Sequence, residues 1–156
     1  MSSKPEELTS WPATTEDKHL AVQVCKCLYE INDQQQPILE NKIEKIKFNA
    51  VEFNRCSLAP SDVPGAVLHF LENAEVSYMD FSDNKFGHLG AKEAKILLFS
   101  RERKLKWLDL SYNNFTDNAA KDVAEEIKHS NCTLESLHLS YNTFHRQRRE
   151  GFDWSN

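Results

Sequence analysis

The feature that most constrains this chain is a pattern of apolar residues that recurs four times at nearly constant spacing. The four segments span residues 48–58, 76–86, 105–115 and 134–144, so their starts lie 28, 29 and 29 residues apart. Each segment reads L-x-x-L-x-L-x-x-(N/C)-x-(L/F), where L is a large apolar residue and x is any residue. A fixed period of this length predicts a repeat architecture in which each unit stacks on the next.

Apolar residues alternate with other residues in the middle of each segment, which predicts an extended strand with one buried face. The inward side chains are expected to be Val51, Phe53, Met79, Phe81, Leu108, Leu110, Leu137 and Leu139. Small or amide side chains follow each strand, where they can satisfy backbone groups left unpaired by the turn. These residues are predicted to form a structural ladder of Cys56, Asn84, Asn113 and Asn142.

The connections between the segments predict helices. One is expected to start near Ser61 and Pro64, a second to span 88–101 with Leu89 inward, and a third to span 117–129. The inward residues of the third helix are expected to be Ala120, Val123, Ala124 and Ile127. The fold class is therefore α/β: a short right-handed solenoid with parallel strands on its concave face and helices on its convex face.

The repeated segments resemble leucine-rich repeats of the ribonuclease-inhibitor-like subclass. The resemblance rests on the period of 28 or 29 residues, the helical connections and the Cys or Asn at the ladder positions, and it covers residues 48–144. It implies the solenoid fold and a habit of binding proteins, and it implies no reaction.

Outside the repeats we expect three further regions. Residues 1–15 are predicted to be disordered, and residues 16–47 to form a capping helix, at about 16–32 with Leu20 inward, followed by an irregular half-repeat. Residues 145–156 are predicted to form a C-terminal cap or tail. This tail contains an Arg-rich stretch followed by Phe152 and Trp154, so a polar cap and a binding peptide are both open interpretations.

Composition and motifs narrow the function. The net charge of −5 argues against nucleic-acid binding, and no apolar run is long enough to span a membrane. Residues 1–11 do not resemble a secretory signal, so the four cysteines are expected to be reduced thiols in the cytoplasm. No glycine-rich phosphate loop, nucleophile elbow or metal-ligand spacing is present, which predicts a protein with no enzymatic activity, cofactor or metal.

The outward positions of the strands and turns are the candidate partner-binding residues. Trp107 is the sharpest candidate, since the core does not require a tryptophan at an outward strand position. The full set of candidates is Glu52, Tyr78, Asp80, Trp107, Asp109, Tyr112, His138 and Tyr141. Aromatic rings surrounded by carboxylates favour a protein partner with a basic patch.

The sequence therefore predicts a monomeric protein-interaction module that binds through its concave face. One alternative is a regulatory or targeting subunit that docks on a larger assembly through its N-terminal helix or its Arg-rich tail. Another is a bacterial effector that acts on a host protein in the host cytosol. The residues alone do not separate these interpretations.

Overall fold

The computed structural model describes residues 10–11, 18–23, 49–62, 76–90, 105–128 and 132–144. The strands are β1 (Ser10–Trp11), β2 (Ala50–Glu52), β3 (Tyr78–Asp80), β4 (Trp107–Asp109) and β5 (Ser136–His138). The helical elements with defined bounds are the 3₁₀ turn η2 (Gly87–Leu89) and the α-helix α5 (Asp117–Ile127). Residues 18–23 are also helical.

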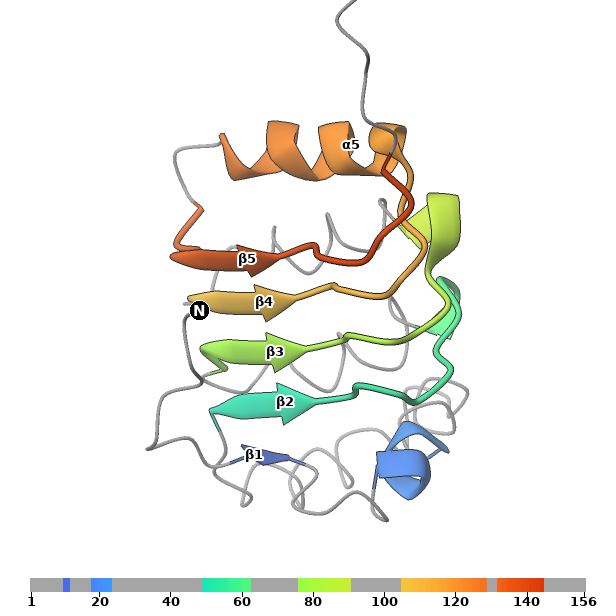
Figure 1. Cartoon of the computed structure of the whole chain (residues 1–156). Coiled ribbons are helices and arrows are strands. Elements are labelled where there is room, and N and C mark those ends of the chain that lie inside the picture. The colour runs from blue at the N-terminus through green and yellow to red at the C-terminus, as the bar shows by residue number, and fades with distance from the viewer. Residues whose placement is uncertain are drawn as a thin grey trace, which may run out of the picture.

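The strands form one parallel sheet in chain order, β1-β2-β3-β4-β5, and Figure 1 shows them lying side by side. The apolar residue at the centre of each repeat strand lies in register with its neighbours, from Val51 through Met79 and Leu108 to Leu137. Each step joins equivalent positions 28 or 29 residues apart, which is the period of the sequence. The parallel α/β repeat arrangement predicted from the sequence is therefore observed.

The alternation predicted for the strands is observed in their burial. Val51, Phe53, Met79, Phe81, Leu108 and Leu110 are all 0% exposed. The phenylalanines extend this core beyond the strands, since ring centroids are 6.0 Å apart for Phe53 and Phe81, and 6.3 Å apart for Phe86 and Phe115. Burial of such large side chains is the main stabilising contribution available to a short repeat protein.

Backbone pairing continues past the ends of the strands into the turns. Phe53 N donates to Asp80 O at 2.8 Å, and Tyr112 N donates to Ser140 O at 3.1 Å. Arg55 N donates to Ser82 O at 3.0 Å in the equivalent position of an earlier repeat. Because this pairing is regular, outward side chains from successive repeats form aligned columns.

The side chains of the asparagines at the ladder positions link neighbouring turns. Asn84 Nδ2 donates to Phe53 O and Phe81 O, both at 2.9 Å, and Asn84 Oδ1 accepts from Cys56 N at 3.2 Å and Leu58 N at 2.9 Å. Asn142 makes the equivalent four hydrogen bonds one period after Asn113. Asn113 Oδ1 is buried and has no hydrogen-bond partner within the described residues, so that rung is incomplete.

Helix α5 packs on the core through a narrower face than expected. Val123 is buried as predicted, and Ala119 is the other buried residue among the side chains of this helix that the structure describes. Ala120 is half-buried, whereas Ala124 is exposed, so the predicted inward position of Ala124 is wrong. The helix starts at Asp117, and the buried face follows from Ala119 to Val123 with a spacing of four residues.

Several expectations for the other segments are also corrected. Disorder is wrong for Ser10 and Trp11, which form β1 and pair with Ala50 and Val51. Leu20 is 66% exposed, whereas Lys18, Ala21 and Val22 of the same helical segment are buried. The cause is the rotation of that helix, which turns Lys18 towards the strands. Leu89 is exposed on η2 instead of inward. The remaining parts of 1–47 and the segment 91–104 lie outside the described residues.

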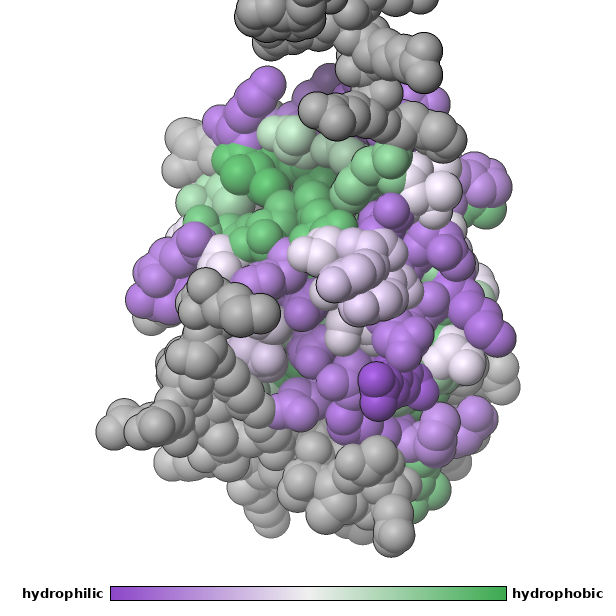
Figure 2. Space-filling model, in the orientation of Figure 1, coloured by the Kyte–Doolittle hydropathy of each residue, from purple (hydrophilic) through white to green (hydrophobic). Residues whose placement is uncertain are grey.

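The core is less completely covered at β5. The apolar side chains that pack there are only partly buried, namely Ile127, Leu134, Leu137 and Leu139. Figure 2 shows an apolar area between α5 and β5, the two elements beside these residues. The predicted cap at 145–156 lies outside the described residues. Within the described part of the chain, no helix combines the length and apolar character needed to cross a bilayer.

Candidate functional site

The outward face of the sheet, on the opposite side from the core, carries two aligned columns of side chains. Strand pairing places Tyr78 beside Trp107 in the first column. It places Asp80 beside Asp109, and Asp109 beside His138, in the second column. Glu52 begins the second column, in register with Asp80. We call this surface the outer sheet face. It corresponds to the face that the sequence predicts to be concave.

Trp107 is held between two ring systems. Its indole stacks on Tyr78 with a centroid separation of 4.0 Å and an interplanar angle of 9°, and it contacts the His138 ring at 4.8 Å. Trp107 is half-buried, and its Nε1 is buried with no hydrogen-bond partner among the described residues. This arrangement makes Trp107 a rigid part of the outer sheet face.

Tyr78 is much less accessible than the sequence suggests. It is 5% exposed, so the expectation that it stands free on the surface is wrong. Burial raises the pKa of Tyr78, and the nearby carboxylates of Asp80, Glu52 and Asp109 raise it further. The tyrosine is therefore neutral and supports Trp107, and the carboxylates give this region a negative potential.

The two equivalent aspartates of the second column differ in their hydrogen bonds. Asp80 Oδ1 accepts from Ser82 N at 2.9 Å and Ser82 Oγ at 2.6 Å, and its Oδ2 accepts from Asn54 Nδ2 at 2.8 Å. Asp109 Oδ1 likewise accepts from Ser111 N at 2.8 Å and from Ser111 Oγ. Within the described residues, no hydrogen bond to Asp109 Oδ2 is formed. Asp109 therefore presents an open acceptor where Asp80 does not.

A third column stands on the turn that follows each strand, and its backbone is left-handed. The φ angles are 57° at Arg55, 55° at Asp83, 55° at Tyr112 and 56° at Tyr141. Side chains other than glycine, asparagine and aspartate adopt this conformation at a cost. Neighbours in this column interact in pairs. Arg55 Nε lies 3.2 Å from Asp83 Oδ2, and the rings of Tyr112 and Tyr141 stack at 4.3 Å.

The stacked tyrosines are the most accessible aromatic surface within the described residues. Tyr112 is 50% exposed and Tyr141 is 73% exposed. Desolvation raises the pKa of Tyr112, and the adjacent Tyr141 and Asp83 raise it further, so the hydroxyl is neutral at neutral pH. Two rings held nearly parallel form a stiff apolar surface that loses little side-chain entropy on binding.

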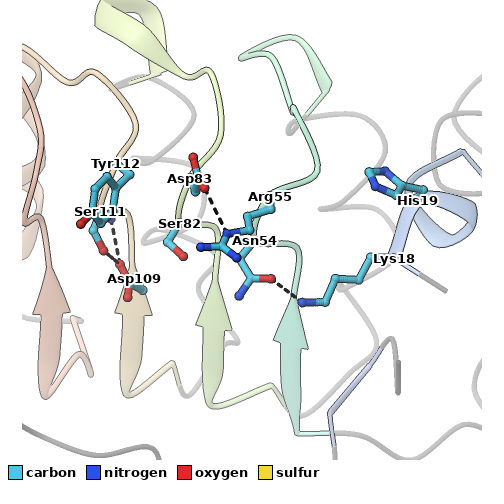
Figure 3. Close-up of a pocket in the computed structure, with 9 residues that line it drawn as sticks. All are labelled: Lys18, His19, Asn54, Arg55, Ser82, Asp83, Asp109, Ser111 and Tyr112. Carbon is cyan, nitrogen blue, oxygen red and sulfur yellow. Dashed lines mark hydrogen bonds and ion pairs between the residues drawn. The ribbon is translucent and has the colours of Figure 1, made fainter. Parts of the chain in front are cut away.

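A groove of about 600 Å³ runs beside this column. Figure 3 shows Lys18 and His19 on one side of it and Tyr112 on the other, with the turn residues between them. The groove is lined by Lys18, His19, Asn54, Arg55, Ser82, Asp83, Asp109, Ser111 and Tyr112. Lys18 Nζ donates to Asn54 Oδ1, and Asn54 in turn donates to Asp80, so this lysine is buried and engaged.

The structure places the predicted residues unevenly around this groove. Asp109 and Tyr112 line it, Tyr141 stacks on Tyr112, and Trp107 and His138 lie on the adjacent outer sheet face. Sequence reasoning missed Lys18 and His19, because no pattern connects them with strands more than 30 residues away. Arg55 and Asp83 occupy the same turn position as Tyr112, which was the available signal for including them.

Within the same described segments, no group of three or more His, Cys, Asp or Glu side chains is arranged to hold a metal ion. Cys56 is a free thiol whose pKa is raised by burial, although Lys18 partly opposes the shift. A protonated and buried thiol is a poor nucleophile. The groove is lined by polar and charged side chains and by Tyr112, which can make binding contacts.

Two segments of the chain match a known protein family. Residues 102–124 and 130–145 match a model described as a leucine-rich repeat. These two segments are therefore similar to leucine-rich repeats. The matched segments include β4, β5 and most of α5, and they carry Trp107, Asp109, Tyr112 and Tyr141. Leucine-rich repeats are commonly protein-interaction modules and are typically non-enzymatic. No curated protein matches the chain.

Proposed function

We propose that this leucine-rich repeat protein is a non-enzymatic module that binds a protein partner through its outer sheet face and the adjoining groove. The observation that carries the proposal is the exposed Tyr112–Tyr141 stack at the rim of that groove. Exposed, rigid aromatic side chains beside a concave surface are typical anchors of protein interfaces.

The backbone at these tyrosines strengthens the argument. Both adopt positive φ, where a residue with a Cβ costs about 1–2 kcal/mol relative to the right-handed conformation. The core gains little from either ring, because both are exposed. A costly backbone position that carries a large exposed ring supports a role for the ring in binding.

The charges around the groove support a partner with a basic patch. Glu52, Asp80 and Asp109 form one column beside Trp107, and they all raise the pKa of Tyr78. Complementary charge on a partner increases the association rate and the specificity of the complex. We further propose that the protein acts as a monomer in the cytoplasm and belongs to the ribonuclease-inhibitor-like subclass.

The test is an affinity capture from lysate with a double variant, Tyr112→Asn/Tyr141→Asn. Asparagine tolerates the left-handed backbone, so the change removes both rings without forcing the turns to move. A matched control replaces two exposed residues of α5, Lys121→Ala/Glu125→Ala. We expect a captured partner, once purified, to bind the double variant about 30-fold more weakly, or about 2 kcal/mol, by calorimetry.

Equal affinity of the wild type and the tyrosine variant for that partner would contradict the proposal. Such a result would favour docking through an end of the repeat array. The specific observation in support of that second candidate is the partial exposure of Leu137 in β5 and of Leu139 just after it. Circular dichroism of both variants would show whether any loss of binding comes from loss of folding.

A further inference from the structure

The open acceptor on Asp109 has a specific structural origin. In the preceding repeat, Asn54 reaches the second carboxylate oxygen of Asp80. The residue equivalent to Asn54 one repeat later is Ser82, and its shorter side chain donates to Asp80 Oδ1 instead. As a result, Asp109, which lines the groove, has no donor to its Oδ2 from the described residues. A carboxylate oxygen in this position is suited to accept a hydrogen bond from a ligand.

A second acceptor and an aromatic ring lie beside it. Tyr141 covers one face of the Tyr112 ring, and Asp83 occupies the equivalent turn position on the other side of Tyr112. The side chain of Asp83 is much shorter than that of Tyr112. The outer part of the Tyr112 ring face that is directed towards Asp83 therefore extends beyond the aspartate. Asp83 Oδ2 faces Arg55, whereas Asp83 Oδ1 has no hydrogen-bond partner within the described part of the chain. Figure 3 shows Tyr112 and Asp109 at one end of the groove, and Asp83 between them and Arg55.

The cations already present in the groove are committed to other contacts. Lys18 donates to Asn54, and Arg55 pairs with Asp83 through Nε. Both side chains of the Arg55–Asp83 ion pair are exposed, so the pair contributes little to the stability of the fold. The Tyr112 end therefore combines one aromatic face with two carboxylates, Asp83 and Asp109. Each has one oxygen without a donor among the described residues, and Arg55 pairs with the other oxygen of Asp83.

We infer that this end of the groove, formed by Asp83, Asp109 and Tyr112, receives the guanidinium group of an arginine side chain on the protein partner. The inference rests on the proposed function and adds the chemistry of the contact. A guanidinium group is planar, stacks on aromatic faces and donates hydrogen bonds in its own plane to carboxylates. A lysine ammonium group matches the carboxylates but not the flat ring face.

The test uses a defined probe, acetyl-glycyl-arginyl-glycinamide, added to ¹⁵N-labelled protein and followed by NMR. The uncharged control is the same tripeptide with citrulline in place of arginine, and a lysine tripeptide tests the preference for guanidinium. We expect the arginine probe to shift the amide signals of Asp83, Asp109 and Tyr112 and to bind about tenfold more tightly than the citrulline probe.

Three variants and one control variant localise the contact. Asp109→Asn keeps an oxygen for Ser111 but removes the charge, and we expect it to weaken the arginine probe about tenfold. Tyr112→Asn is expected to weaken it, while Tyr112→Phe keeps the ring and should bind as the wild type does. Glu135→Gln removes one charge at an exposed position paired with Lys106, and it should leave binding unchanged.

Equal binding of the arginine and citrulline probes, or unchanged binding by Asp109→Asn, would overturn the inference. Equal affinity for the lysine probe would overturn the preference for guanidinium. These failures are distinct from failure of the proposed function. A partner whose capture depends on Tyr112 and Tyr141, together with unchanged affinity of Asp109→Asn for the probe, would support the interface and reject the arginine site.

Discussion

At Tyr141 the backbone and the side chain have opposing preferences. Its φ of 56° favours glycine, yet its ring is stacked on Tyr112 and 73% exposed. Stacking of two aromatic rings contributes about 0.5–1.5 kcal/mol, which is similar to the cost of the left-handed backbone. The two contributions nearly cancel in the folded state, so stability alone does not account for a tyrosine at this position.

This balance predicts an unusual order of stabilities among variants of Tyr141. Tyr141→Gly should be more stable than Tyr141→Ala by about 1 kcal/mol, because only alanine retains the strain of a Cβ at positive φ. Urea unfolding of the two variants measures the difference directly. Ser136 lies on a strand without positive φ, so Ser136→Gly should be less stable than Ser136→Ala. The same order at both positions would contradict this explanation.

The turns after the strands depend on the side-chain amides between them. Asn84 donates to three backbone carbonyls and accepts from two backbone N–H groups of its own turn and the preceding one. Cys56, at the equivalent position of the preceding repeat, makes one weak side-chain contact with Asn54 O at 3.4 Å. The same position in successive repeats therefore contributes very different amounts of stability.

We predict that Asn84→Ala destabilises the protein by about 3 kcal/mol or more, because it leaves several buried backbone groups unpaired. Cys56→Ala should cost about 1 kcal/mol, since it removes a small apolar volume and one weak contact. Chemical unfolding monitored by circular dichroism compares the two. Similar losses for both variants would show that the asparagine amide is not a main support of the turns.

Across the whole molecule, burial of the core decreases towards β5. Leu110 is 0% exposed between neighbouring repeats, whereas the equivalent Leu139 is only partly buried. Among the described strands, β2, β3 and β4 each have a neighbouring strand on both sides, whereas β5 has one on a single side. This gradient follows from stacking, since a repeat contacts only its neighbours.

The gradient predicts unequal effects of the same substitution. Leu110→Ala should cost about 2–5 kcal/mol, the usual range for truncation of a fully buried leucine. Leu139→Ala should cost less than half as much, because its side chain already contacts solvent. Urea midpoints of the two variants provide the comparison. A loss at Leu139 as large as that at Leu110 would mean that other parts of the chain cover β5.

The parallel α/β repeat arrangement and the buried face of each strand could be predicted from the sequence alone. The reason is that the strand pattern repeats every 28 or 29 residues. An ambiguous assignment in one repeat can therefore be resolved by comparison with the other repeats. The alternation around Val51, Met79 and Leu108 is a local property of the chain. The alternation in the sequence agrees with the burial in the structure because each repeat packs against neighbours of the same geometry.

The sequence does not predict which side chains meet around the groove or how exposed they are, because these features depend on tertiary packing. The burial of Tyr78 depends on stacking with Trp107 from the next repeat, and the exposure of Leu20 depends on the rotation of a segment outside the repeats. Lys18 reaches Asn54 across 36 residues of sequence, and the open oxygen of Asp109 results from a shorter neighbour, Ser82. These contacts join segments that share no sequence pattern, so packing in three dimensions determines them.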